Sequence, residues 1–142
     1  MVEQNQERHM PVYGSADEVY TYVGGAFREA AAQPEIAAQF AAVGSTLCMH
    51  CTDPDAAITI RLADPVEVIT GDDGESAEIH LYLKADDADR FLRGTLNIPM
   101  AMVKRQVRAS GPIDAVLKLV PATKPLIPIY ERLTASRPAA AT

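Results

Sequence analysis

The hydrophobic positions of this chain first follow the period of a helix. From Ser15 to Ala30, apolar residues recur at spacings of three and four, which predicts an amphipathic helix. Ser15 and Glu18 form a capping-box pattern at its start. Pro34 favours the start of a second helix, and Gly44 is a natural residue to end it. The first third of the chain is therefore predicted to form two helices.

The period then changes to two, as in strands with one apolar face. Short turns separate the apolar stretches, and Gly71–Gly74 resembles a hairpin loop. Strands that follow one another through short turns usually pair antiparallel, so a meander is expected with one covered face. The predicted strands are Thr46–Cys51, Ala57–Leu62, Val66–Thr70 and Ser76–Lys84.

Helical signals return after Lys84. Proline and glycine divide the rest of the chain into short pieces, with one brief basic strand among them. The order of helices, strands and helices predicts an α+β fold with one face of the sheet covered. The predicted pieces are a helix over Ala85–Arg93, a short helix from Pro99, a strand over Arg105–Ser110, a helix from Pro112 and an apolar stretch over Leu126–Leu133. We expect one domain over 15–133, with a flexible tail over 1–14 and a disordered end over 134–142.

Composition narrows the function classes. The chain has 142 residues, of which 48% are hydrophobic, and its net charge is −6. Nucleic-acid binding depends on clustered Lys and Arg, so this acidic balance argues against it. No apolar run reaches the ~20 residues that span a bilayer, and residues 1–10 have no signal-peptide pattern. A cytoplasmic protein is expected.

Cys48 and Cys51 lie three residues apart on a predicted strand, so their side chains should point to opposite faces. With His50 they supply three potential zinc ligands, one short of a closed site. We therefore expect structural cysteines, no metal and no cofactor. His50 and His80 are expected to face away from the apolar set, as solvated or hydrogen-bonded side chains rather than catalytic bases.

Two charged groups have a simple structural interpretation. Asp86, Asp87 and Asp89 suit the start of a helix by charge–dipole complementarity. A cluster of basic residues in and just before the last predicted strand is best explained as a solvated strand edge. Contact of this cluster with a ligand carboxylate or an anionic lipid surface stays open. This cluster consists of Lys104, Arg105 and Arg108.

With this order of elements, the chain resembles the sterol carrier protein type 2 family over Gly44–Leu133. Three segments carry the resemblance. They are Phe91-Leu92-Arg93-Gly94, the basic strand Val103–Gly111 that ends in glycine, and the apolar helix that begins Asp114-Ala115-Val116-Leu117-Lys118-Leu119. The family usually has a glycine before the basic strand, where this chain has Ala101-Met102-Val103.

The resemblance implies a five-stranded, mostly antiparallel sheet, covered by N- and C-terminal helices, with an apolar tunnel between the sheet and the C-terminal helices. It implies non-enzymatic binding of a fatty acid, acyl chain or sterol, for transfer or storage, with at most transient contact with a membrane surface and no catalytic residues. Met100 and Met102 suit an adaptable pocket wall. The expected lipid-binding residues are Phe40, Ile60, Phe91, Leu96, Ile98, Met100, Met102, Val103, Leu117, Leu126, Ile129 and Tyr130.

Two other functions stay open. A small cone-shaped α+β enzyme of the ketosteroid-isomerase type would need a carboxylate base and a hydrogen-bond donor in an apolar pocket. Its candidate residues are Tyr13, Asp17, Tyr20 and Tyr22. Alternatively, the stripe over Leu126–Leu133 could dock on another protein or on a second copy of the chain, as a homodimer.

Overall fold

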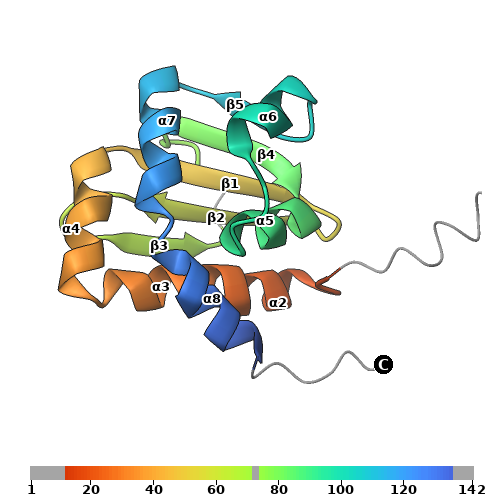
Figure 1. The fold of residues 1–142 in the computed structure, drawn as a ribbon, viewed down its shortest axis with the longest axis horizontal. Coiled ribbons are helices and arrows are strands. Elements are labelled where there is room, and N and C mark those ends of the chain that lie inside the picture. The colour runs from red at the N-terminus through yellow and green to blue at the C-terminus, as the bar shows by residue number, and fades with distance from the viewer. Residues whose placement is uncertain (1–11, 72–73, 136–142) are drawn as a thin grey trace, which may run out of the picture.

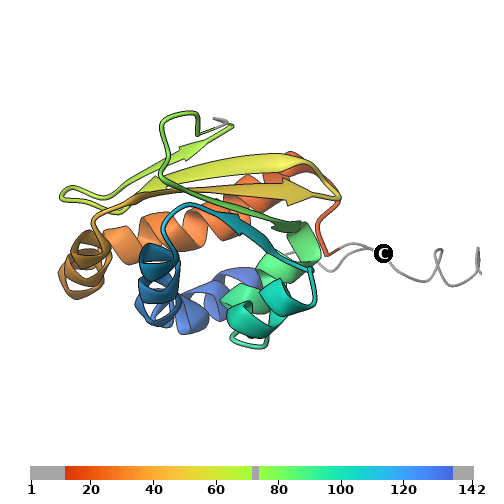
Figure 2. The ribbon, with the colours of Figure 1, turned by 90° about the horizontal axis from the view of Figure 1, so that it is seen from above.

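The five strands form one layer, and the described helices all lie on the same side of it (Figures 1 and 2). The computed structural model describes residues 12–71 and 74–135. The strand order is β3-β2-β1-β4-β5, so the predicted α+β class is confirmed. The elements in chain order are α2 (Ala16–Val19), the π-helical turn η1 (Tyr20–Gly24), α3 (Gly25–Ala31), α4 (Pro34–Val43), β1 (Thr46–Thr52), β2 (Ala56–Arg61), β3 (Glu67–Thr70), β4 (Ile79–Lys84), α5 (Ala85–Leu92), α6 (Ile98–Val103), β5 (Arg108–Ser110), α7 (Ile113–Ala122) and α8 (Leu126–Ala135).

The first helical run begins at the predicted cap. The backbone N–H of Glu18 donates to Ser15 Oγ at 3.3 Å, and the Glu18 carboxylate accepts from the backbone N–H of Gly14 at 2.6 Å. Elements α2, η1 and α3 then follow one another without a break, so the predicted helix contains one π-helical turn. The second helix, α4, begins at Pro34 and ends before Gly44, whose φ of 71° suits glycine.

Alternation along the strands assigns side chains to a covered and an open face. On β1, Met49 and Cys51 belong to the core between the sheet and the helices, whereas Cys48 and His50 lie on the opposite, open face. The two cysteines therefore lie on opposite faces, as predicted. On β4, His80 and Tyr82 lie on the open face. The covered-face residues of the central strands are at most 4% exposed, and they are Leu47, Met49, Cys51, Ile58, Ile60, Ile79, Leu81 and Leu83.

The predicted meander is wrong at its last step. β4 pairs with β1 in parallel, with Leu47 opposite Ile79, instead of pairing antiparallel with β3. The segment Gly71–Gly74 is therefore not a hairpin loop. Residues 74–78, which lead into β4, lie on the open side of the sheet (Figure 2). The other three strand pairs are antiparallel, so the sheet is mostly antiparallel, as expected.

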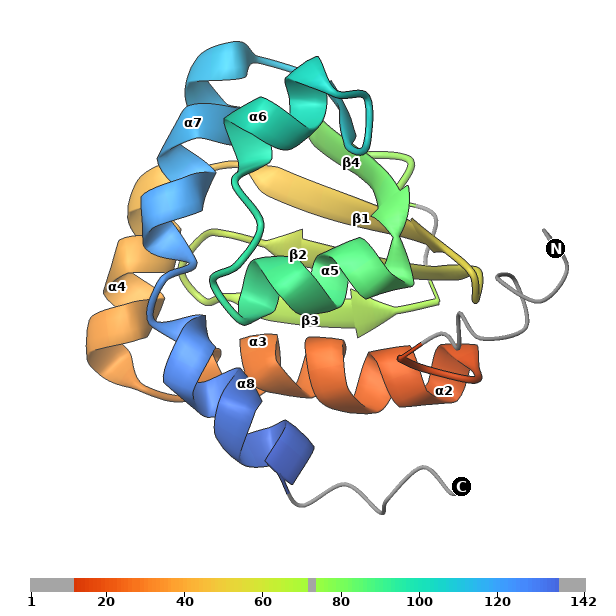
Figure 3. The ribbon, with the colours of Figure 1, turned by 45° about the vertical axis from the view of Figure 1, so that its right-hand side comes forward.

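The C-terminal helices complete the layer beneath the sheet (Figure 3). α8 packs on α3 and α5, and α7 packs on α4. In Figure 1, β5 lies between α6 and the start of α7. The strand β5 is shorter than the predicted Arg105–Ser110, because the backbone turns at Arg105 with a φ of 63°. None of the helices within residues 12–71 and 74–135 has the length and apolar character needed to cross a membrane.

Both ends of the predicted domain continue into ordered structure. Tyr13, just before the expected start at 15, is fully buried, and the backbone N–H of Val12 donates to Asp86 at 2.9 Å. α8 runs on to Ala135, just past the expected end at 133. The rest of the two predicted tails, 1–11 and 136–142, lies outside the described residues.

Candidate functional site

The residues predicted to line an apolar tunnel fall into three groups by exposure. Leu96 and Met102 are partly buried and pack against the core. The exposed members are Met100, Val103 and Leu117, with exposed fractions of 51%, 77% and 52%. The buried members are Phe40, Ile60, Phe91, Ile98, Leu126, Ile129 and Tyr130. The predicted set therefore combines core positions with apolar surface positions on α6 and α7.

The short helix α6 presents apolar side chains on both of its faces. The Asn97 side chain caps its start by accepting from the backbone N–H of Met100 at 2.9 Å. Ile98 and Ala101 are buried on the inner face, whereas Met100 and Val103 are exposed on the outer face. The apolar side chains of the inner face are explained by their burial in the core. Those of the outer face are not covered by any of the described residues.

A surface groove lies between α4 and α7. Its volume is about 430 Å³, within the usual range for small-molecule sites. Its lining residues are Gln39, Ala42, Val43, Lys118, Pro121 and Ala122. None of these residues was predicted from the sequence to bind a ligand. Two features of the sequence could have indicated the groove. They are the small, apolar residues at the C-terminal end of α4 and the proline inside α7.

Tyr130 also belongs to a buried polar network. Its hydroxyl donates to Asp89 Oδ1 at 2.5 Å and also contacts the Tyr13 hydroxyl. Because the single Tyr130 proton is directed to the carboxylate, Tyr13 is the donor to Tyr130. Arg93 Nε lies 3.1 Å from Asp89, and its guanidinium lies 5.1 Å from the centre of the Tyr130 ring. The network thus joins Tyr13, which precedes α2 in the sequence, to α5 and α8.

The electrostatics of this network favour a neutral phenol. Burial raises the pKa of Tyr130, and its hydrogen bonds to Asp89 and Tyr13 raise it further. The charge of Asp89 is compensated by Arg93. Of the candidate residues for an isomerase, Tyr13 is therefore engaged in a structural network, and Asp17 lies in the first turn of α2. The described residues thus do not bring these two side chains together as an acid–base pair.

The basic cluster is divided between two surfaces. β5 is an edge strand, and its Arg108 guanidinium lies 4.9 Å from the ring centre of Tyr82 on the open face. Arg105 lines a polar depression with Asp86, Asp87 and other side chains near the start of α5. The cluster therefore does not form one anion-binding patch.

Comparisons of the sequence and of the structure with known proteins indicate the same family. A family model described as the SCP-2 sterol transfer family matches residues 26–124. The structure is similar to that of the apo form of sterol carrier protein 2 from Yarrowia lipolytica, with a TM-score of 0.62 and 14% identity over 72% of this chain and 87% of that one. It is also similar to the sterol carrier protein domain 2 of Helicoverpa armigera, with a TM-score of 0.61 and 14% identity over 78% of this chain and 88% of that one. No curated protein sequence matches the chain.

The same fold is also part of a larger enzyme. A sec-alkylsulfatase from Pseudomonas sp. matches with a TM-score of 0.54 and 16% identity over 61% of this chain, but over only 14% of the enzyme. At such identities the likeness concerns the fold alone. The fold is therefore found both as a small protein and as one part of a longer chain.

Proposed function

Because the chain belongs to the SCP-2 sterol transfer family, we propose that it binds one lipid molecule and transfers or stores it without changing it chemically. The lipid is a fatty acid, an acyl chain or a sterol. The matched residues 26–124 include the whole sheet and the helices from α4 to α7. They therefore contain both the apolar surface of α6 and the groove between α4 and α7.

The exposed apolar side chains of the C-terminal half carry the proposal. The large hydrophobic residues that the described structure leaves exposed are Ile69, Met100, Val103 and Leu117. All except Ile69 lie on α6 and α7, which are found at the same end of the helical layer (Figure 3). Exposed apolar side chains that cluster in this way are typical of a surface that binds an apolar partner.

The groove between α4 and α7 supports the proposal that a lipid binds at this surface. Leu117 lies one helical turn before Pro121, which lines the groove, so the apolar surface continues along α7. Lys118 also lines the groove and is exposed, so its ammonium group is available to the carboxylate of a fatty acid. The tail would then lie over Leu117 and reach towards Met102 on α6.

The free energy of binding would come from the tail. Each methylene removed from water contributes about 0.8 kcal/mol, so a sixteen-carbon chain gains roughly 10 kcal/mol before the costs of association. An ion pair with an exposed lysine adds about 1 kcal/mol or less. The proposed carrier would therefore select for chain length more strongly than for the head group.

Native mass spectrometry of the purified protein, followed by organic extraction, tests this function first. We expect a co-purified mass that matches a fatty acid or sterol, and displacement of a fluorescent fatty acid by unlabelled lipid. A protein that carries no lipid and does not bind the fluorescent probe would contradict the proposal. The exposed surface of α6 and α7 would then be better explained as a site for another protein or a second copy of the chain.

A further inference from the structure

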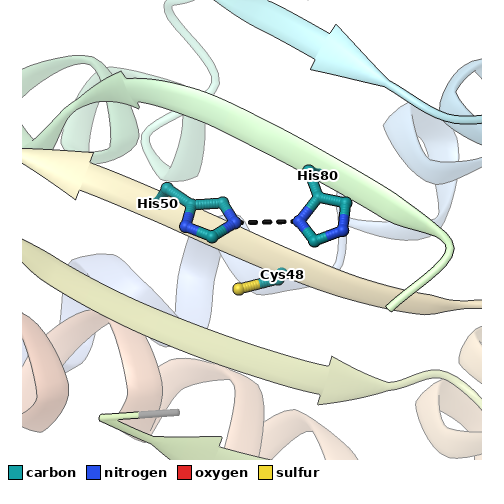
Figure 4. Close-up of side chains that lie close together, drawn as sticks. All are labelled: Cys48, His50 and His80. Atoms are coloured by element: carbon teal, nitrogen blue, oxygen red, sulfur yellow. Dashed lines mark hydrogen bonds between the residues drawn. The ribbon is translucent and has the colours of Figure 1, made fainter. Parts of the chain in front are cut away.

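The open face of the sheet has a cluster of one thiol and two imidazoles, contributed by Cys48 and His50 on β1 and by His80 on β4. The parallel pairing places Cys48 opposite His80, and alternation places His50 on the same face as Cys48. Figure 4 shows the two rings directed towards each other, with the sulfur close by. The cluster therefore depends on the β1–β4 pairing that sequence adjacency did not predict.

The distances in the cluster are close to those around a single metal ion. His50 Nε2 and His80 Nδ1 are 2.8 Å apart, and these nitrogens and the Cys48 sulfur all lie within 4.8 Å of one another. Zinc binds imidazole nitrogen at about 2.0–2.1 Å and thiolate sulfur at about 2.3 Å, so tetrahedral ligand atoms are about 3.3–3.7 Å apart. The two nitrogens need to separate by only about 0.5 Å to reach this geometry.

The side chains around the cluster hold it in place. The Tyr82 ring stacks on the His50 ring with their centres 4.5 Å apart and an interplanar angle of 11°. Gly74 covers the Cys48 side chain so closely that a Cβ at Gly74 would lie 2.5 Å from the sulfur. The thiol is fully buried, whereas both histidines are half-buried at the surface. The ligand atoms thus have restricted positions before any ion binds.

We propose that Cys48, His50 and His80 form a binding site for a divalent zinc-type ion on the open face of the sheet. One thiolate and two imidazoles are a preferred donor set for zinc, and three protein ligands leave one tetrahedral position for water or an external ligand. The site lies on the opposite side of the sheet from α6 and α7. It is therefore independent of the proposed lipid carrier function.

The proton balance of binding follows from the cluster. The Cys48 Sγ–H bond breaks as the sulfur–metal bond forms, and its proton passes to solvent. In the His50–His80 hydrogen bond, one of the two facing ring nitrogens carries a proton. That nitrogen must lose its proton before it can bind the ion. The other nitrogen of the same ring takes up a proton in exchange, so each imidazole stays neutral. Binding of one ion therefore releases one proton.

Cobalt is a suitable probe because it occupies zinc sites and has absorption bands that report its ligands. The full chain, reduced and stripped of metal, is titrated with Co²⁺ and then with Zn²⁺. We expect one Co²⁺ per chain, a thiolate-to-cobalt charge-transfer band, visible bands typical of tetrahedral cobalt and loss of both on addition of Zn²⁺. Calorimetry of Zn²⁺ binding in buffers of different ionisation enthalpy should give one proton released per ion.

Variants test the assignment of the ligands. Cys48→Ser should abolish the charge-transfer band, and His50→Gln or His80→Gln should each weaken Zn²⁺ binding at least ~10-fold. Cys51→Ala is the matched control, because Cys51 lies on the covered face and its removal should leave the band unchanged. Circular dichroism shows whether each variant is folded. The two histidine variants change half-buried side chains, so they provide the test even if Cys48→Ser does not fold.

Three outcomes would overturn the proposal. The first is a folded, reduced wild-type chain that gives no charge-transfer band with Co²⁺. The second is a band that survives in Cys48→Ser and is lost in Cys51→Ala. The third is Zn²⁺ binding that is equally tight in the wild type and in both histidine variants. None of these results would bear on lipid binding, which has its own measurement.

Discussion

The Tyr130 hydroxyl donates a hydrogen bond to the Asp89 carboxylate at 2.5 Å and so joins α8 to α5 inside the protein. Tyr130 is fully buried and Asp89 is 7% exposed, so little water can replace this interaction. The Tyr13 hydroxyl and Arg93 complete the network from either side. A polar network that is fully satisfied in this way specifies how the helices dock.

Tyr130→Phe removes the central hydroxyl of this network. Asp89 and Tyr13 each lose a partner, and leaving such buried groups unsatisfied costs about 1–3 kcal/mol, with charged groups at the high end. We expect the free energy of unfolding, measured by urea denaturation, to fall by about that amount. The matched control is Tyr82→Phe, whose hydroxyl has no hydrogen bond within the described residues, and it should change stability by less than about 0.5 kcal/mol. Equal stabilities of the two variants would contradict the proposed role of the network.

Stability should fall in alkaline solution because of Cys51. Burial raises the pKa of the Cys51 thiol from 9.0 to about 12, and the neighbouring Cys48 thiol adds to this effect. Between these values the unfolded chain has lost the thiol proton and the folded chain has kept it, so the free energy of unfolding decreases as pH rises. The contribution is about 1.4 kcal/mol per pH unit.

Urea denaturation of the wild type and Cys51→Ala at several pH values measures this effect. The alanine variant has no thiol at this position, so its stability should decline less steeply between pH 9.0 and about 12. Parallel declines in the two proteins would show that Cys51 ionises as easily in the folded chain as in the unfolded one. In that case the thiol would not be protected by the core.

Gly74→Ala tests the close approach of the chain to Cys48. A Cβ at Gly74 would lie 2.4 Å from the Cys48 Cβ, and the φ of 66° is itself unfavourable for alanine. Gly71→Ala is the control, since its φ is 82° but its added Cβ would meet no atom closer than 4.0 Å. Gly71→Ala should cost about 1–2 kcal/mol of stability from the backbone alone. Gly74→Ala should cost about 1–3 kcal/mol more because of the overlap.

The proposed lipid surface predicts a pair of charge substitutions. Leu117→Glu and Met102→Glu should each weaken the binding of a fluorescent fatty acid at least ~10-fold, because a carboxylate would have to be desolvated beside the tail. Ile69→Glu is the matched control, since Ile69 is 41% exposed but lies on the sheet, away from α6 and α7. It should leave binding unchanged. Equal loss of affinity in Leu117→Glu and Ile69→Glu would exclude the α6–α7 surface as the binding site.

Much of the fold was predictable because local patterns determine local structure. The Ser15–Glu18 cap, Pro34 and Gly44 marked the limits of the helices, and alternation assigned the faces of β1 and β4. Adjacency in the sequence predicted the β1–β2 and β2–β3 pairs but not the position of β4 beside β1. β4 has three almost fully buried side chains on its covered face, which suits a central strand, whereas Glu67 and Ile69 on β3 are exposed, which suits an edge.

The candidate sites were predictable only in part, for the same reason. The apolar residues of α6 and α7 were predicted as lipid-binding from the family resemblance, but periodicity could not say that Met100, Val103 and Leu117 would be on the surface. The sequence also suggested Cys51 as a potential zinc ligand beside Cys48 and His50. The structure instead brings His80 to them, because β4 lies next to β1.

The parallel β1–β4 pair also affects how the chain reaches its fold. β1, β2 and β3 pair through short connections, whereas the β1–β4 pair joins two strands that β2 and β3 separate in the sequence. Closing this longer loop costs entropy before any contact is gained, so we expect assembly of the central pair to be slower than formation of the β2–β3 hairpin. Substitutions at Leu47 or Ile79, which lie opposite each other in that pair, are therefore expected to slow folding more than substitutions in the β2–β3 hairpin.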